Sequence, residues 1–67
     1  MFDARLLASF VAVARLRHFG KAALAVHATQ PGISQHVARL ERQLGFALLV
    51  RSKRSVELTA AGDTFLR

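Results

Sequence analysis

Residues 30 to 38 combine amide, hydroxyl and small side chains, and they include no Asp, Glu, Lys or Arg. In a helix, at about 100° per residue, the side opposite the apolar positions would present mostly short or uncharged polar groups. Amides can donate and accept hydrogen bonds at the edge of adenine, and small apolar groups can contact the thymine methyl. We therefore expect a helix that contacts base edges in a DNA major groove through Gln30, Pro31, Ser34, Gln35 and Ala38.

Cations lie before and after this segment, where they could bind phosphate without sequence preference. The run 51–55 adds a basic cluster that would lie along a DNA backbone or place an Arg in the minor groove. The expected backbone contacts are Lys21, Thr29, His36, Arg39, Arg42, Arg51 and Lys53. Two plainer interpretations stay open: a solvated helix face, and charges that protect an edge strand. A solvated face, however, usually carries long charged residues in opposite-sign pairs.

The sequence does not indicate a metal site or a catalytic site. None of His18, His27 and His36 lies four residues from another, the chain has no Cys, and its four acids are scattered. A nucleophile with a base and an orienting group, or a Gly-rich phosphate loop, is not recognisable either. We expect no metal, no cofactor and no enzymatic activity.

The composition is typical of one small intracellular domain. The 67 residues carry a formal charge of +6, which favours a polyanionic partner such as nucleic acid, although solubility alone could explain it. No apolar run approaches the roughly 18 residues of a membrane-spanning helix. The first residues lack the basic and apolar segments of a signal peptide. We expect a cytoplasmic protein without a membrane partner.

Apolar periodicity predicts the elements that must position these residues. Spacings of three and four predict a helix over 4–16 with Asp3 as its N-cap, and a short helix over 21–27. Thr29 should cap a longer helix over 30–44 that ends before Gly45. Beyond it, 46–50 and 56–58 predict a β-hairpin with a cationic tip, and Thr59 should cap a fourth helix.

This order of elements is that of a winged helix–turn–helix domain, a mainly α fold. It has three helices, a small two-stranded hairpin that forms the wing, and the start of a further helix. We expect the domain to span 1–59, with the helix–turn–helix segment at 18–37 and the wing at 46–58. Residues 60–67 would begin the fourth helix.

Five motifs cover nearly the whole chain, from Leu6 to Gly62. They are Leu6-x-x-x-Phe10-x-x-Val13-Ala14, Phe19-x-x-Ala22-Ala23, Thr29-Gln30-Pro31-x-Ile33-Ser34, Leu40-Glu41-x-x-Leu44-Gly45, and Leu48-x-x-Arg51 leading to Val56-x-Leu58-Thr59-x-Ala61-Gly62. Together they resemble the N-terminal DNA-binding domain of LysR-type transcriptional regulators.

The resemblance implies a bacterial transcription regulator whose third helix enters the major groove of a dyad-symmetric site. It implies a homodimer or higher homo-oligomer formed through a linker helix beyond residue 60, and a C-terminal domain that binds a small-molecule effector. Gln30, Pro31 and Ser34 match the family's DNA-contacting residues, and Arg54 matches its wing arginine for the minor groove. Gly20 replaces a usual Ser or Thr and should weaken a helix cap. Gln35 replaces a common Arg.

Two alternatives belong to other classes. A winged-helix module for protein interaction or dimerisation would use the third helix as a contact surface and should carry an apolar face there. A basic membrane-binding element should expose aromatic or Leu-rich stripes, whereas we expect Phe10, Phe46 and Phe65 to belong to the core.

Overall fold

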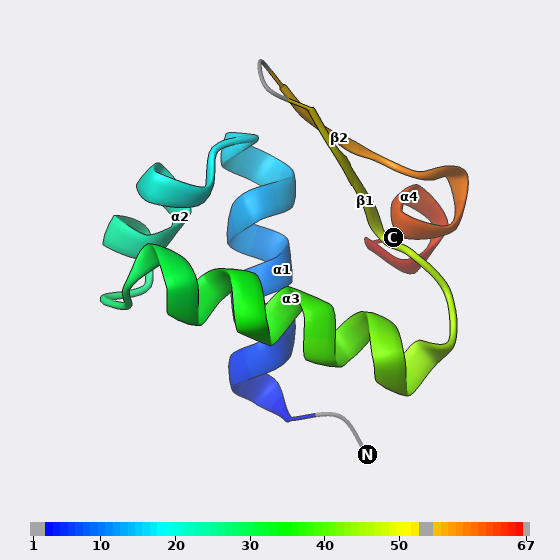
Figure 1. Cartoon of the computed structure of the whole chain (residues 1–67), viewed down its shortest axis with the longest axis horizontal. Coiled ribbons are helices and arrows are strands. Elements are labelled where there is room, and N and C mark those ends of the chain that lie inside the picture. The colour runs from blue at the N-terminus through cyan, green and yellow to red at the C-terminus, as the bar shows by residue number, and fades with distance from the viewer. Residues whose placement is uncertain (1–2, 53–54, 67) are drawn as a thin grey trace.

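The computed structural model describes residues 3–52 and 55–66, and over these residues the chain forms four helices and one hairpin. The bounds are α1 Ala4–Leu16, α2 Phe19–Ala25, α3 Gln30–Leu44, β1 Leu49–Arg51, β2 Val56–Leu58 and α4 Ala60–Leu66. Figure 1 shows α1, α2 and α3 packed together, with the hairpin rising beside them and α4 at its base. The predicted winged helix–turn–helix order is confirmed.

The bounds of α1 and α3 follow from side-chain and backbone caps. The Asp3 carboxylate accepts the Arg5 N–H at 2.8 Å, and the Thr29 hydroxyl oxygen accepts the Gly32 N–H at 3.1 Å. Each cap satisfies an amide that has no partner within its helix. At the other end of α3, Gly45 adopts a φ of 83°, which glycine tolerates, and donates its N–H to the Glu41 carbonyl.

The second helix begins earlier than the sequence predicts. The expected span was 21–27, whereas α2 runs from Phe19 to Ala25. His18 is the N-cap, because its Nδ1 accepts the Lys21 N–H at 3.0 Å, and Gly20 lies inside the first turn rather than at a cap position. His27 lies beyond the end of α2, where it is exposed and has a φ of 56° in the turn before α3.

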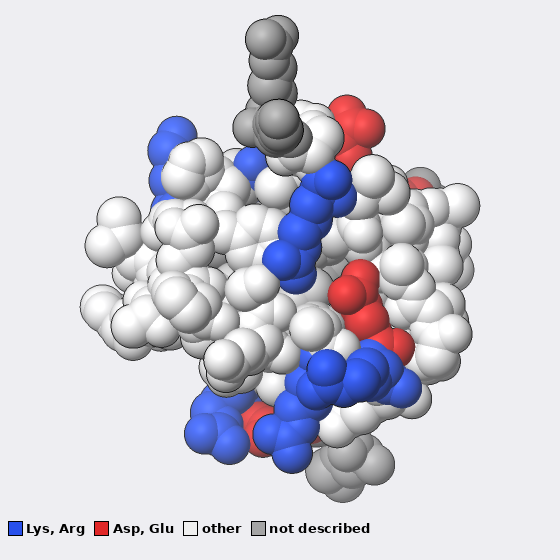
Figure 2. Space-filling model, viewed as in Figure 1, with Lys and Arg blue, Asp and Glu red and all other residues white. Residues whose placement is uncertain are grey.

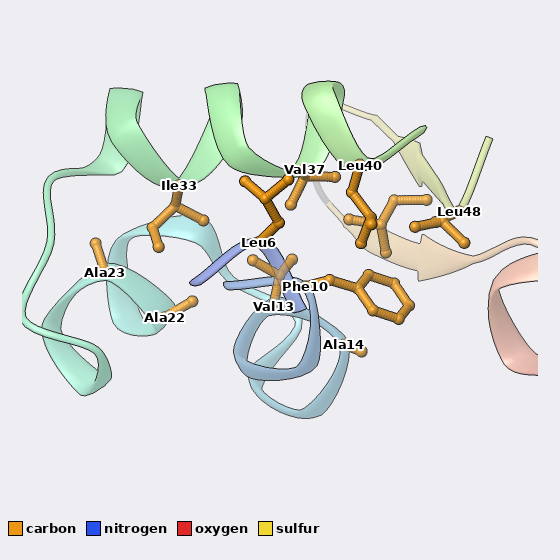
Figure 3. Packing of buried hydrophobic residues seen from close by; sticks show 11 residues of the cluster. Leu6, Phe10, Val13, Ala14, Ala22, Ala23, Ile33, Val37, Leu40 and Leu48 are labelled. Atoms are coloured by element: carbon orange, nitrogen blue, oxygen red, sulfur yellow. The ribbon is translucent and has the colours of Figure 1, made fainter. Parts of the chain in front are cut away.

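The core lies where α1, α2 and α3 meet (Figure 3). Burial of each large apolar side chain contributes about 1.5–3 kcal/mol to folding. Ala22 and Ala23 on α2 are small enough to allow close approach of the other two helices. The buried cluster is Leu6, Phe10, Val13, Ala14, Ala22, Ala23, Ile33, Val37, Leu40, Leu48 and Leu49.

The wing is an antiparallel hairpin in which Leu49 pairs with Leu58 and Arg51 with Val56. Its first strand does not span 46–50 as expected. Leu48 is fully buried before the strand, and its N–H donates to the Glu41 carboxylate at 2.7 Å rather than to a strand neighbour. Phe46, expected in the core, is 42% exposed. The strand therefore begins at Leu49 and includes Arg51, which was expected in the tip.

The hairpin and α4 are joined at Thr59, as expected from its sequence. Its hydroxyl accepts the Gly62 N–H at 2.8 Å and donates to the Ala47 carbonyl at 2.7 Å. Gly62 packs directly on the backbone, because a Cβ there would lie 2.1 Å from the Leu48 carbonyl oxygen. The α4 helix thus packs firmly against the hairpin, while a domain boundary after residue 59 stays a prediction. Within the described ranges, no helix has the length and apolarity needed to cross a bilayer.

Candidate nucleic-acid interface

The side of α3 that faces away from the core carries the five predicted base contacts. We call Gln30, Pro31, Ser34, Gln35 and Ala38 the polar face of α3. Gln30, Pro31 and Gln35 are exposed, and Ser34 and Ala38 are half-buried, whereas Ile33, Val37 and Leu40 on the opposite side are fully buried. The 3.6-residue period therefore places all five on the accessible side of one helix.

A hollow separates the first turn of α1 from the middle of α3. Gln35 and Ala38 of the polar face line it together with the cations Arg5, Arg39 and Arg42. Figure 2 shows Lys and Arg side chains gathered along this edge of the molecule, below α3 and near the N-terminal end of α1. The structure thus places the predicted phosphate contacts Arg39 and Arg42 beside the predicted base contacts.

One acidic group lies at the same edge. The Arg5 guanidinium forms a 3.1 Å ion pair with the Asp3 carboxylate. The hydrogen bond from the Arg5 side chain lowers the pKa of the Asp3 carboxyl below its ordinary value, with the backbone N–H of Arg5 as the second contribution. Arg5 therefore offsets the negative charge that Asp3 would bring to this surface.

His36, predicted to contact the DNA backbone, also makes a hydrogen bond within the fold. Its ring is half-buried, and Nδ1 lies 2.7 Å from the Ser9 hydroxyl on α1. Ser9 is only 2% exposed, and sequence reasoning missed it. Its spacing was the available signal, since Ser9 lies three residues after Leu6 and four before Val13, on the buried side of α1.

Arg51 does not extend from the wing tip. It lies at the end of β1, and its Nη1 donates to the Ser34 hydroxyl oxygen at 2.8 Å. The guanidinium carbon also lies 4.3 Å from the centre of the Phe19 ring, at the start of α2. Such a cation–π contact at an exposed site contributes about 0.5–1 kcal/mol. One side chain thus connects the wing, α2 and α3.

The other predicted backbone contacts divide into two groups. Lys21 on α2 is exposed, and so is Thr29, whose hydroxyl oxygen caps α3 and whose O–H can still donate. Lys53 and Arg54 lie outside the described residues. Next to them, the Ser55 N–H donates to the Ser52 hydroxyl at 3.0 Å. The described residues hold no group of three His, Asp or Glu side chains placed to bind a metal.

Comparisons with known proteins agree over nearly the whole chain. Residues 4–63 match the family of bacterial regulatory helix-turn-helix proteins, lysR family. The HTH-type transcriptional regulator AlsR of Bacillus subtilis (strain 168) is 53% identical over 64 residues, which are 96% of this chain and 21% of AlsR. The regulator BudR of Klebsiella aerogenes is 51% identical over 63 residues, covering 94% of this chain and 44% of BudR.

Solved structures show the same likeness. The crystal structure of the CbnR_DBD–DNA complex matches with a TM-score of 0.92 and 45% identity, covering 97% of this chain and 75% of that one. The BenM_DBD/benA site 1 DNA complex matches with a TM-score of 0.91 and 38% identity, covering 97% and 73%. The chain spans about a fifth of the length of AlsR.

Proposed function

The chain belongs to the LysR family of bacterial regulatory helix-turn-helix proteins, and from this membership we propose that it binds double-stranded DNA sequence-specifically. The polar face of α3 carries the proposal, because it is accessible, lacks acids and projects groups that can bond base edges. A net charge of +6 supports attraction to phosphate. Structural neighbours that are themselves DNA complexes support the same function.

In this proposal α3 enters the major groove, and its polar face contacts bases. Lys21 and Thr29 lie toward its N-terminal end, and Arg39 and Arg42 toward its C-terminal end, where each can reach a phosphate. Arg54 would enter the minor groove, as the family resemblance implies, and Lys53 would lie on the backbone. His36 can offer a phosphate only the ring nitrogen that does not face Ser9.

We also propose that the whole protein is a transcription regulator that acts in the bacterial cytoplasm, by binding rather than by catalysis. Its relatives AlsR and BudR are HTH-type transcriptional regulators.

The whole protein would form a homodimer or higher homo-oligomer through the helix that begins at residue 60, on a dyad-symmetric site. An apolar hollow lined by Phe46, Ala61 and Phe65 supports this, since it gives α4 an accessible apolar face. A small-molecule effector would bind a C-terminal domain beyond this chain.

A selection from random duplexes at moderate salt tests the function. The chain, fused to a dimerising helix, should enrich a two-fold symmetric consensus. A chain that enriches nothing, and whose duplex binding does not respond to salt, would instead be a winged-helix module for protein interaction or dimerisation.

The Gln30→Ala variant tests base contact on the selected site. Loss of a bidentate amide should weaken binding to the preferred duplex by about 1–3 kcal/mol and binding to a scrambled duplex by less. Fluorescence anisotropy with both duplexes measures the difference. Equal losses on the two duplexes would exclude Gln30 from base recognition.

A further inference from the structure

Three elements meet at the guanidinium of Arg51. We call Arg51, Phe19 and Ser34 the Arg51 junction. Arg51 ends the first strand of the wing, Phe19 begins α2, and Ser34 belongs to the polar face of α3. Figure 1 shows the hairpin rising beside the end of α1 that leads into α2. The junction is therefore a point where the position of the wing depends on the helix proposed to contact bases.

The hydrogen bond within the junction has a fixed direction. A guanidinium carries donors and no acceptor, so the 2.8 Å contact requires the Ser34 oxygen to accept from Arg51. The single O–H of Ser34 is then left to donate elsewhere. A charged donor on the same oxygen also polarises the hydroxyl and strengthens the bond that its hydrogen makes.

The Phe19 ring restricts where the guanidinium can lie. Phe19 is half-buried at the first position of α2, and His18 fixes that position by capping the helix through its Nδ1. With its guanidinium carbon 4.3 Å from the ring centre, Arg51 is held over the ring face, next to Ser34. A Lys at this position would keep the charge but lose the planar group and its fixed donors.

We propose that Arg51 is a positioning residue for base recognition, which orients the Ser34 hydroxyl as a hydrogen-bond donor toward an acceptor atom on a base edge. The acceptors available in the major groove are N7 of either purine, O6 of guanine and O4 of thymine. Arg51 thereby acts on sequence preference through Ser34. The inference rests on the proposed DNA-binding function and adds a specificity role to a residue first expected to contact phosphate.

A direct phosphate contact makes a different prediction for the same residue. Loss of a phosphate contact weakens binding to every duplex and lowers the slope of log K against log salt by about 0.9. Loss of the junction instead weakens binding to the preferred duplex and leaves a scrambled duplex nearly unaffected. The ratio of the two affinities therefore separates the two roles.

The test is a double-mutant cycle on the 67-residue chain in its dimerised form, with Arg51→Met, Ser34→Ala and the double variant. We expect each single variant to lower the preferred-to-scrambled affinity ratio by about 3- to 10-fold, the range of one hydrogen bond. The double variant should lose no more than either single one, because both remove the same contact. Arg51→Lys should not restore the ratio, and Phe19→Leu should lower it partly.

Arg15→Met is the matched control, since Arg15 is an exposed cation on α1 beside α2 and away from the polar face. It removes the same charge and should leave the affinity ratio unchanged.

Three results would overturn the inference. They are losses that multiply in the double variant, full rescue of the affinity ratio by Arg51→Lys, and equal losses on both duplexes with a reduced salt slope. If Arg51→Met unfolds the chain, a double-mutant cycle of Phe19→Leu with Ser34→Ala replaces it. Losses of the affinity ratio that do not multiply support the inference, and losses that multiply overturn it. A wild-type chain without duplex preference overturns the proposed function as well.

Discussion

Ser9 and His36 form a hydrogen bond between α1 and α3 that also limits what the interface can do. The 2.7 Å contact joins a nearly fully buried hydroxyl to a half-buried ring next to Gln35 of the polar face. A buried hydroxyl needs a partner, because leaving it without one costs about 1–3 kcal/mol. His36 thus stabilises the fold through Ser9. Any contact of His36 with a phosphate must be made with its ring in this same position.

His36→Leu should lower the free energy of unfolding by about 1–3 kcal/mol, because leucine fills the site without offering Ser9 a partner. Ser9→Ala should be milder, and the double variant should recover part of the loss, because the hydroxyl is then gone. Urea denaturation followed by circular dichroism measures all three. Gln35→Leu, at an exposed neighbour, is the control and should change stability by less than about 0.5 kcal/mol. Strictly additive losses would rule out the coupling.

The residues of the polar face could be predicted because a single helical period decides which side of α3 is accessible. The spacing of Ser9 could have indicated its burial but not its partner, because His36 is 27 residues away in the sequence. The role of Arg51 was hidden for the same reason: both of its contacts, with Phe19 and with Ser34, are long-range. Composition and spacing indicated a cation near the wing tip but not the direction of its side chain.

At the scale of elements, α3 holds the wing in place through its single acid, Glu41. The Glu41 carboxylate accepts the N–H groups of Leu48 and Leu49, at 2.7 and 3.3 Å, just where the chain enters β1. A second contact holds the base of the hairpin, where Thr59, just after β2, donates its N–H to the Leu48 carbonyl. The angle between the wing and α3 is therefore set by hydrogen bonds, although Glu41 looked like one of several scattered acids in the sequence.

Glu41→Ala should destabilise the fold by about 1.5–3 kcal/mol, since two amides lose a charged acceptor. Glu41→Gln keeps an acceptor oxygen and should lose less. Thermal and urea unfolding measure the stability, and Glu57→Ala on β2, an exposed acid, is the control that removes the same charge. A Glu57→Ala loss as large as that of Glu41→Ala would show that net charge, and not this contact, matters.

The two long helices were predicted to the residue, because α1 and α3 extend over 13 and 15 residues and have caps of usual types. The short elements were not. The seven residues of α2 carry too few turns for periodicity to fix its start, and its cap is a histidine, which lies outside the usual set. Strands of three residues are likewise too short for alternation to place their ends, so the start of β1 was missed.

Over the described residues of the molecule, the two most exposed large apolar side chains lie on other elements than the cations of the hollow between α1 and α3. Leu24 and Val50 are 79% and 57% exposed, on α2 and on the wing, whereas cations line the hollow between α1 and α3. Figure 2 shows a group of Lys and Arg side chains at the lower edge of the face that presents α3. A cation there can reach a phosphate that flanks the proposed base contacts, while a cation on the far side of α1 acts only through its distant field.

Salt dependence should therefore differ between cations that carry the same charge. Lys21→Ala and Arg42→Ala should each weaken binding to preferred and scrambled duplexes alike, and each should lower the slope of log K against log salt by about 0.9 if it removes one phosphate contact. Arg15→Ala removes an equal charge beside the apolar groove of α1 and α2 and should leave the slope unchanged. Anisotropy titrations at four or more salt concentrations give the slopes.

If the Lys21→Ala and Arg42→Ala variants both keep the wild-type slope, neither residue contacts a phosphate. If Arg15→Ala lowers the slope as much as they do, net charge governs the affinity, and the arrangement of cations around α3 does not.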